Sequence, residues 1–371
     1  MPENERLTQI SQRSKEIKRT EEGLEQSARG TCDRAAPPHT RFLRFPSCFT
    51  LNHLTADLQS WVDRLRRGDA LALSRAITTV ENHAPGWRDL LKELFPHTGR
   101  ARIIGLTGAP GAGKSTLVDH LARQYRQENR SVGIIAVDPT SPYTGGAILG
   151  DRIRMQHHFS DPGVYIRSMA TRGFLGGLAG ATADVSAILD ASGRDFVLIE
   201  TVGVGQDEVD VVRLADITVV ILVPGMGDDV QSIKAGIMEI ADIFVINKSD
   251  HPGAERVERE IRALQSLAAG SDRWIPPIVK TVASEGLGIE DLVAAIRQWE
   301  TYQQAGNRDR VRQAENWEGR LMAMLRDALI DEVLERMPAD AVARYAAEIA
   351  AHQRDPYTLV EEIVGRLGTK S

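Results

Sequence analysis

A glycine-rich octapeptide at residues 108–115, Gly-Ala-Pro-Gly-Ala-Gly-Lys-Ser, narrows the choice of fold more than any other feature of the sequence. It follows an apolar run at 103–107 and opens a helical pattern. Glycines let backbone N–H groups converge on phosphate oxygens without obstruction by side chains. The helix that follows adds the positive end of its dipole. An apolar strand, this loop and a helix together predict a phosphate-binding loop in an α/β protein.

Around this loop, short apolar runs alternate with helical patterns. The runs of strand length lie at 103–107, 132–137, 164–168, 196–201, 217–223, 243–247 and 278–282. Helical patterns lie between most of them, at 117–125, 175–189, 232–240, 254–267 and 289–299. Apolar strands that alternate with helices predict a doubly wound, mostly parallel sheet with helices on both faces. Ligands of such a sheet bind at the carboxyl ends of its strands, where the glycine-rich loop also falls.

The pattern changes on either side of this region. Residues 1–50 mix acidic and basic residues without an apolar period, which predicts a disordered extension. Residues 51–99 carry apolar residues at helical spacing, which predicts an N-terminal helical segment. We therefore expect the nucleotide-binding domain to cover residues 100–300 and a C-terminal helical segment to cover 301–371.

The C-terminal segment begins with an apolar stripe from Val311 to Val333. This stripe predicts one helix of about eight turns that ends at Met337 and Pro338, followed by two shorter helical stretches. A helix of this length needs a surface that covers its apolar side. The main domain and a second subunit are both open as that surface.

Composition excludes several classes of function. The net charge of −6 gives a nucleic-acid partner no electrostatic support. Both cysteines, Cys32 and Cys48, lie in the first 50 residues, so residues 51–371 hold neither a disulfide nor a thiolate metal site. The longest apolar runs are too short to span a bilayer, and the N-terminus lacks the pattern of a secretory signal. We expect a cytoplasmic enzyme or regulator without a membrane partner.

The octapeptide assigns roles to individual residues. Its backbone would bind the phosphates of a nucleotide, Lys114 would reach the β- and γ-phosphates, and the Ser115 hydroxyl would bind Mg²⁺. The predicted phosphate-binding residues are Gly108, Ala109, Pro110, Gly111, Ala112, Gly113, Lys114, Ser115 and Thr116.

A second motif selects the base. Asn247-Lys248-Ser249-Asp250 follows an apolar run at 243–246. The Asp250 carboxylate suits guanine because it accepts both N1–H and the exocyclic amine, while the stem of Lys248 lies along the ring. Adenine has an unprotonated N1 and would leave that carboxylate without its donors, so the motif predicts GTP rather than ATP. The alternative is a strand-to-helix turn capped by Asp250.

The loop at Val282, Ala283 and Ser284 ends the last predicted strand, and its backbone is suited to meet the guanine carbonyl. An ordinary connection is the alternative for this loop.

Acidic residues at neighbouring strand ends predict the rest of the magnesium site. Asp138 closes one apolar run, Asp151 follows a glycine-rich stretch, and Glu200 closes another run. With Ser115 they form the predicted metal site, because carboxylates near a γ-phosphate can hold and sense the ion. Helix caps or surface charges are the alternative for each carboxylate.

Two further segments are candidates for steps in hydrolysis. Asp228 and Lys234 lie in and after a glycine-containing loop, which is either an ordinary connection or a third nucleotide-sensitive switch. Gln206 is the candidate for orienting water, and with Lys114 and Glu200 it completes the predicted catalytic set. No residue stands out as an unaided base, so we expect slow hydrolysis that a partner accelerates.

Four segments together resemble the MeaB/ArgK-type G-protein chaperones, within the G3E family of P-loop GTPases. They lie at 106–119, 137–155, 200–207 and 224–250, and Asp355-Pro356-Tyr357 is similar as well. The likeness covers about residues 54–367, and the first 50 residues depart from it.

This resemblance implies a GTP-hydrolysing metallochaperone that assists and protects an adenosylcobalamin-dependent acyl-CoA mutase, usually methylmalonyl-CoA mutase. It implies that the GTPase gates cofactor loading, and that it forms a homodimer through the C-terminal helices. By motif, it places Mg²⁺ and switch carboxylates at Asp138, Asp151 and Glu200, and a third switch at Asp228 and Lys234.

Two other functions fit a P-loop GTPase. A GTPase that delivers nickel or zinc usually carries cysteine or histidine clusters, and residues 51–371 have no cysteine. A kinase acting on a small molecule or protein would transfer the γ-phosphate to an acceptor rather than to water.

Overall fold

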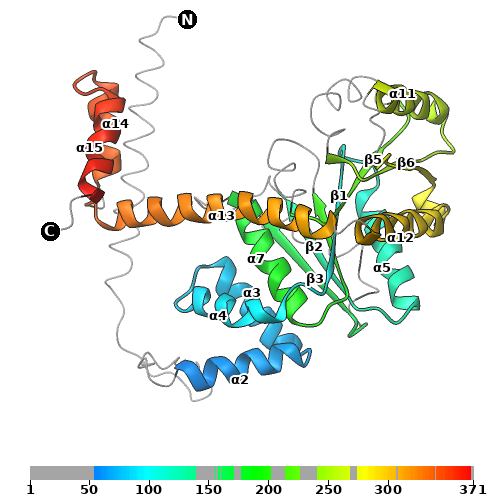
Figure 1. Ribbon diagram of the computed structural model, residues 1–371, viewed down its shortest axis with the longest axis horizontal. Helices are drawn as coiled ribbons and strands as arrows, with labels where there is room; N and C mark the ends of the chain where they lie inside the picture. Colours follow the sequence, from blue (N-terminus) through cyan, green and yellow to red (C-terminus); the bar gives the residue numbers. More distant parts are fainter. Residues whose placement is uncertain are drawn as a thin grey trace, which may run out of the picture. The chain divides into compact units, whose positions relative to one another are not determined.

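A computed structural model describes residues 54–138, 155, 158, 160–170, 177–201, 214–225, 240–267, 274–305, 308–338 and 340–368. Its centre is a 7-stranded sheet with the strand order β3-β2-β4-β1-β5-β6-β7. All pairings between these strands are parallel (Figure 1). The doubly wound sheet predicted from the sequence is confirmed, and in the described residues it is parallel throughout.

The seven strands lie where apolar runs predicted them, with ends that differ by two residues at most. They are β1 (Arg102–Gly108), β2 (Val132–Asp138), β3 (Val164–Ala170), β4 (Phe196–Thr201), β5 (Ile217–Leu222), β6 (Ile243–Asn247) and β7 (Ile278–Thr281). Every residue of β5 and β6 is buried, because helices cover both faces of the sheet and leave no strand face to water.

The direction of the connections positions a ligand site. From β1 the chain crosses to β2 on one side, whereas from β5 it crosses to β6 on the other side. Loops that follow the adjacent strands β1 and β5 therefore diverge, and such a switch point opens a crevice at the carboxyl edge of a parallel sheet. The glycine-rich loop follows β1 and lies at this crevice.

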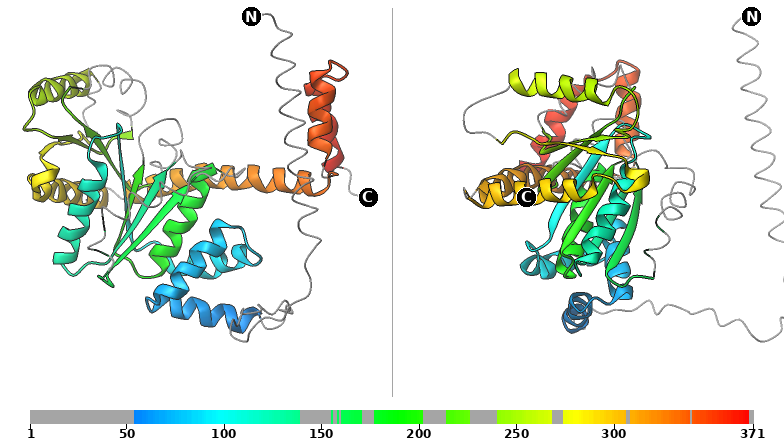
Figure 2. Two further views of the ribbon diagram at one scale, coloured as in Figure 1. Left: turned by 180° about the vertical axis from the view of Figure 1, so that it is seen from behind. Right: turned by 90° about the vertical axis from the view of Figure 1, so that its right-hand side faces the viewer.

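Helices lie on both faces of the sheet (Figure 2), and alternate residues of each strand face opposite layers. On one face, α5 (Lys114–Gln127) and α12 (Ile289–Ala305) pack on residues such as Leu198 of β4 and Val245 of β6. On the other face, α7 (Gly177–Ala191) covers Val197 and Ile199 of β4, and α11 (Ala254–Leu267) covers Phe244 of β6. The predicted helix at 232–240 lies outside the described residues except for Ile240.

Three N-terminal helices complete the second layer. They are α2 (Leu54–Arg66), α3 (Ala70–Glu81) and α4 (Trp87–Leu94), followed by the short 3-10 helix η1 (Phe95–His97). α3 begins where Asp69 caps it, since its side chain accepts the backbone N–H groups of Leu71 and Ala72. Val62 and Leu73 share one hydrophobic cluster with Ile135 of the sheet, so these helices belong to the core of the main domain.

The C-terminal helices are α13 (Arg308–Glu335), α14 (Ala341–Ala350) and α15 (Pro356–Gly368). α12 continues to Ala305, so the domain boundary expected at residue 300 falls inside a helix, and the division of the chain into domains remains a prediction. The 28 residues of α13 match the long helix predicted from its apolar stripe. None of the helices in the described residues is both long and apolar enough to cross a membrane.

Side-chain contacts hold α13 on the main domain. Arg312 donates to both carboxylate oxygens of Asp242, at 2.7 and 2.8 Å. Arg320 donates to Asp184 of α7 at 2.8 Å. Burial raises the pKa of Asp184 above its usual range, and the guanidinium of Arg320 opposes that rise. The main domain therefore covers part of α13. The sequence left the main domain and a second subunit open as the surface that covers this helix.

Candidate functional site

The glycine-rich loop joins β1 to α5 through backbone conformations that suit glycine. Gly108, Gly111 and Gly113 have φ angles of 149°, 76° and 92°. A Cβ atom on Gly108 would lie 2.2 Å from the carbonyl oxygen of Ile221, and one on Gly113 would lie 2.3 Å from Nδ2 of Asn247. Real Cβ atoms do not approach other atoms so closely, so this loop needs glycine at both positions.

Lys114 is the first residue of α5, and its side chain folds back over the loop. Its Nζ atom donates to the carbonyl oxygens of Gly108, at 2.5 Å, and Ala109, at 3.0 Å. The side chain is 5% exposed. A buried ammonium group beside the loop and the N-terminus of α5 gives this cradle the positive character that phosphate binding requires.

Ser115 and Glu200 meet beside the cradle. Ser115 Oγ donates to Oε1 of Glu200 at 2.5 Å, which joins the first turn of α5 to the end of β4. A hydroxyl and a carboxylate oxygen at this distance are hard donors of the kind Mg²⁺ accepts, so the pair fits that ion. Asp138 is the last residue of β2, which pairs with β4, so its backbone lies at the same edge of the sheet.

Four predicted residues lie outside the described part of the chain. They are Asp151, Gln206, Asp228 and Lys234. Their predicted roles in metal binding, water orientation and switching therefore remain predictions.

Asn247 ties the phosphate loop to the loop after β7. Its Nδ2 atom donates to the carbonyl oxygen of Ala112 at 2.7 Å. Its Oδ1 atom accepts the hydroxyl of Thr281 and the backbone N–H of Ala283, each at 3.0 Å. Asn247 is 3% exposed, so three buried hydrogen bonds fix the distance between the two loops. These contacts make Asn247 a brace between the two loops, and its predicted role as a nucleotide ligand stays a prediction.

Lys248 and Asp250 lie beside the same loop and remain accessible. Lys248 adopts a positive φ of 55°, and its Nζ atom donates to the carbonyl oxygen of Gly111 at 3.0 Å. The Asp250 side chain is 51% exposed and lies 3.7 Å from the imidazole of His251. Lys248 therefore contacts the phosphate loop and the Asp250 carboxylate is accessible, while their predicted roles in binding guanine remain predictions.

The loop at 282–284 is more constrained than the sequence indicated. The backbone N–H of Val282 donates to Leu287, and that of Ala283 donates to Asn247. Of the three amides in this loop, Ser284 N–H is the one that no described residue accepts. It is therefore the donor that we would assign to the guanine carbonyl.

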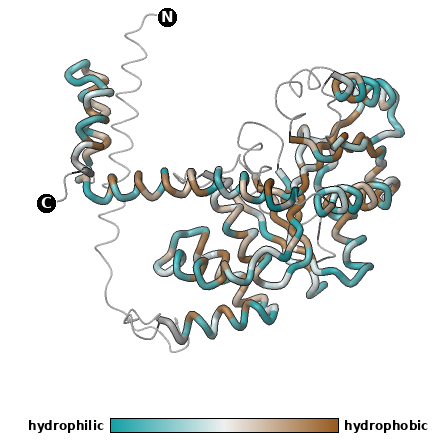
Figure 3. The backbone as a smooth tube through the Cα atoms, in the orientation of Figure 1, coloured by the Kyte–Doolittle hydropathy of each residue, from teal (hydrophilic) through white to brown (hydrophobic). Residues whose placement is uncertain are grey.

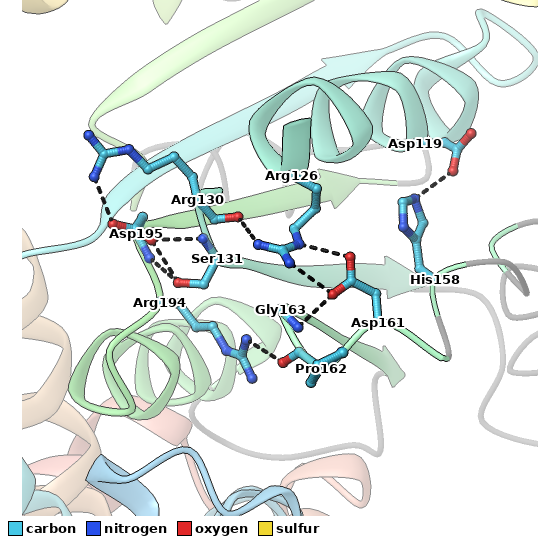
Figure 4. Close-up of polar contacts among 10 residues, drawn as sticks. All are labelled: Asp119, Arg126, Arg130, Ser131, His158, Asp161, Pro162, Gly163, Arg194 and Asp195. Carbon is cyan, nitrogen blue, oxygen red and sulfur yellow. Dashed lines mark hydrogen bonds and ion pairs between the residues drawn. The ribbon is translucent and has the colours of Figure 1, made fainter. Parts of the chain in front are cut away.

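The sequence did not indicate a polar network that anchors His158 and Asp161 to α5 (Figure 4). His158 Nε2 and Asp119 Oδ1 are 2.8 Å apart, and both residues are buried. Arg126 donates to both carboxylate oxygens of Asp161, at 2.8 and 3.0 Å. Because α5 begins at the phosphate loop, these contacts link that loop's helix to the chain segment that enters β3.

Comparisons with known proteins agree with this geometry. Residues 73–338 match the family described as methylmalonyl Co-A mutase-associated GTPase MeaB. A Pyrococcus abyssi protein named as a GTPase is 45% identical over 311 residues, which cover 82% of this chain and 96% of that protein. The mouse protein named methylmalonic aciduria type A homolog, mitochondrial, is 36% identical over 267 residues, covering 65% and 64% of the two chains.

A solved structure has the same fold. The crystal structure of a LAO/AO transport system kinase is 27% identical and has a TM-score of 0.61, with 85% of this chain and 99% of that chain covered. The family match spans more than half of the chain and includes the glycine-rich loop and the Asn247–Asp250 motif. The chain therefore belongs to the MeaB family and is a P-loop GTPase.

Proposed function

We propose that this GTPase serves an adenosylcobalamin-dependent acyl-CoA mutase, with methylmalonyl-CoA mutase as the first candidate. In this proposal its GTP cycle gates the loading of the cofactor and protects the mutase from inactivation. The observation that carries the proposal is the match of residues 73–338 to a family described as mutase-associated. The related mouse protein, named for methylmalonic aciduria, supports the same assignment.

The nucleotide site supports a cycle that depends on a partner. Glu200 is 6% exposed and accepts a hydrogen bond from Ser115, which supports a role in holding a metal ion. Lys114 supplies positive charge for the γ-phosphate. A P-loop GTPase without an unaided catalytic base hydrolyses GTP slowly, and contacts from a partner can accelerate the reaction by orders of magnitude. We assign water orientation to Gln206 and nucleotide-dependent switching to Asp228 and Lys234.

Magnesium is the cofactor in this proposal. Ser115 and Glu200 would hold the ion, with Asp138 and Asp151 completing the protein ligands or binding its water molecules. Mg²⁺ usually keeps several waters and takes its remaining ligands from phosphate oxygens. When bound, it would neutralise charge that develops on the β- and γ-phosphates. The described residues contain no cluster of three or more His, Cys, Asp or Glu side chains that could hold a metal ion by themselves.

A homodimer is the assembly that we propose. Large apolar side chains are exposed along the C-terminal helices, and hydrophobic residues recur along α13 (Figure 3). They are Val311, Trp317, Leu321, Met322, Met324, Leu325 and Leu329 on α13, Val342 on α14, and Tyr357, Val360 and Val364 on α15. A surface with this many exposed apolar groups favours a protein partner, and a second copy of the same helices would cover it symmetrically.

The decisive experiment measures GTP turnover with and without purified methylmalonyl-CoA mutase. We expect the mutase to be retained by the immobilised GTPase and to raise its turnover by at least tenfold, as partner contacts do in related GTPases. The Lys114→Ala variant controls for background hydrolysis and should show no turnover. If no acyl-CoA mutase binds the GTPase or changes its rate, the chaperone proposal is wrong, although the chain remains a GTPase.

A further inference from the structure

A cavity lies at the amino edge of the sheet, opposite the carboxyl edge that carries the nucleotide site. It has a volume of about 350 Å³ and is lined by Asp63, Arg66, Arg67, His97, Arg100, Asp190, Ala191 and Gly193. Arg100 lies just before β1, whereas the phosphate loop follows the same strand. Seven residues of strand separate the two sites by about 20 Å. The cavity is therefore distinct from the GTP site.

Three separate parts of the chain bring arginine or histidine side chains to this cavity. Arg66 and Arg67 come from the end of α2, His97 from η1, and Arg100 from the residues that precede β1. Within the described residues, none of these three guanidinium groups has a side-chain hydrogen bond or an ion pair. Neighbouring arginines differ, since Arg64 pairs with Asp69 at 2.7 Å. Unpaired guanidinium groups that line one cavity indicate a site for an anion.

Two carboxylates, Asp63 and Asp190, also line the cavity, and they differ in how far they neutralise the positive charge of the arginines. Asp190 accepts the backbone N–H groups of Gly99, Arg100 and Ala101, at 2.5, 3.1 and 2.8 Å. These hydrogen bonds engage its charge and fix the backbone that carries Arg100. Asp63 is the remaining acidic group, and three arginines outnumber it. The cavity therefore keeps a net positive lining.

We propose that this cavity binds the phosphate group of a small phosphorylated molecule. Guanidinium groups match the geometry of phosphate oxygens and can donate two hydrogen bonds to each group. The volume is at the lower end for small-molecule sites and admits a phosphate with a small attached group. The lining holds no Trp, Tyr or Phe on which a purine base could stack, so the phosphate rather than a base is the group recognised.

The site also lies at one end of two elements that reach the GTP site. β1 leads from Arg100 to the phosphate loop, and α7 runs back from the nucleotide edge of the sheet to Asp190. A phosphate bound to Arg100 would restrain the backbone that leads into β1. This placement would let the bound anion affect the nucleotide site without contacting it.

The test uses the full chain saturated with a non-hydrolysable GTP analogue and Mg²⁺, so that the γ-phosphate position of the nucleotide site is filled as well. Calorimetry measures the binding of two probes, inorganic phosphate and ribose 5-phosphate. The double variant Arg66→Gln/Arg67→Gln removes two cations from the cavity. Its matched control, Arg256→Gln/Arg262→Gln, removes two exposed arginines of α11 that pair with Glu260 and Glu258. Arg100→Gln gives an independent measurement, because its backbone contact with Asp190 does not use the side chain.

We expect at least one probe to bind the wild type with one site per chain. Binding should weaken by about tenfold or more in Arg66→Gln/Arg67→Gln and in Arg100→Gln, because charge-assisted hydrogen bonds are lost, and should be unchanged in the control. Tighter binding of ribose 5-phosphate would identify an organic phosphate as the ligand, and tighter binding of inorganic phosphate would identify the free ion. The proposal is overturned if neither probe binds at millimolar concentration, or if the cavity variants and the control bind equally. It is also overturned if an acidic peptide binds the cavity and the phosphates do not.

Discussion

At the scale of single residues, close packing determines the nucleotide site. Gly113 has a φ of 92°, and the side chain of Asn247 occupies the space where a Cβ atom would lie. Asn247 in turn holds Ala112 and the loop after β7. The sequence could predict the glycines, because the motif is local. It could not predict the brace, because the partners of Asn247 lie up to 135 residues away along the chain.

Gly113→Ala should therefore damage both folding and GTP binding. The new methyl group would collide with Asn247 and force a conformation that alanine rarely adopts, at a cost of about 1–3 kcal/mol. Chemical denaturation and GTP titration measure the two effects. Gly319→Ala on α13 is the matched control, since a Cβ atom there would meet nothing within 4 Å beyond the adjoining residues and backbone of its own helix, and it should keep or slightly raise stability. Normal GTP binding by Gly113→Ala would contradict the packing argument.

Asp250→Asn should lower affinity for GTP and leave weak ATP binding unchanged. The carboxylate accepts two donors from guanine, and an asparagine side chain can accept only one of them and opposes the other with its amide. Loss of hydrogen bonds to a charged group costs about 1.5–3 kcal/mol, or roughly 10- to 150-fold in affinity. Competition titrations with GTP and ATP measure this change. An equal loss for both nucleotides would show that Asp250 does not read the base.

At the scale of helices and strands, the sequence predicted the positions of the elements, whereas it did not predict the side-chain contacts between them. Apolar runs placed all seven strands, because a strand buried on both faces must be apolar along its whole length. Helical periodicity also found α13, but it could not show that Arg312 and Arg320 hold this helix on the main domain. Periodicity identifies an apolar face without identifying its partner.

The ion pair between Arg126 of α5 and Asp161 should make the protein less stable in acid. Two hydrogen bonds from Arg126 hold the pKa of Asp161 below its ordinary value. A carboxyl whose pKa is lowered by folding contributes stability at pH values above its unfolded pKa of about 4, and the contribution is lost as pH falls through the lower folded value. Urea midpoints of the wild type should therefore fall on acidification from pH 5 to pH 3.

Arg126→Gln tests this cause. The variant should be less stable than the wild type at pH 7, and the difference should shrink as pH falls through the lowered pKa of Asp161. Arg75→Gln is the matched control, because Arg75 is an exposed residue of α3 and lies outside this network. A difference between wild type and Arg126→Gln that stays constant with pH would contradict the assignment.

At the scale of the whole molecule, the exposed apolar groups of the C-terminal helices remain to be covered. Leu321 and Leu325 are 54% and 48% exposed and lie one turn apart on α13. If a second copy covers them, Leu321→Asp/Leu325→Asp should convert the dimer to a monomer, because the interface cannot bury two carboxylates without partners. Sedimentation or light scattering measures the mass. Arg310→Asp, at an exposed position on the same helix, is the control and should remain dimeric.

The two leucines of α13 are not among the residues assigned to the nucleotide site. The monomeric variant should therefore bind GTP as the wild type does, provided that α13 keeps its contacts with Asp242 and Asp184. A monomer that loses GTP binding would show that the dimer contributes to the site. A wild type that is already monomeric would contradict the proposed assembly. The mutase would then be the candidate partner for the exposed apolar side chains of the C-terminal helices.

The central claim is that one nucleotide is held at its triphosphate by the loop at 108–115 and at its guanine base by Asp250. Calorimetric titration of the wild-type chain with GDP and with ADP, both in the presence of Mg²⁺, tests it most directly. We predict one site per chain and an affinity for GDP at least about 100-fold above that for ADP, since adenine leaves the carboxylate without its donors. Equal affinities for the two nucleotides would contradict it.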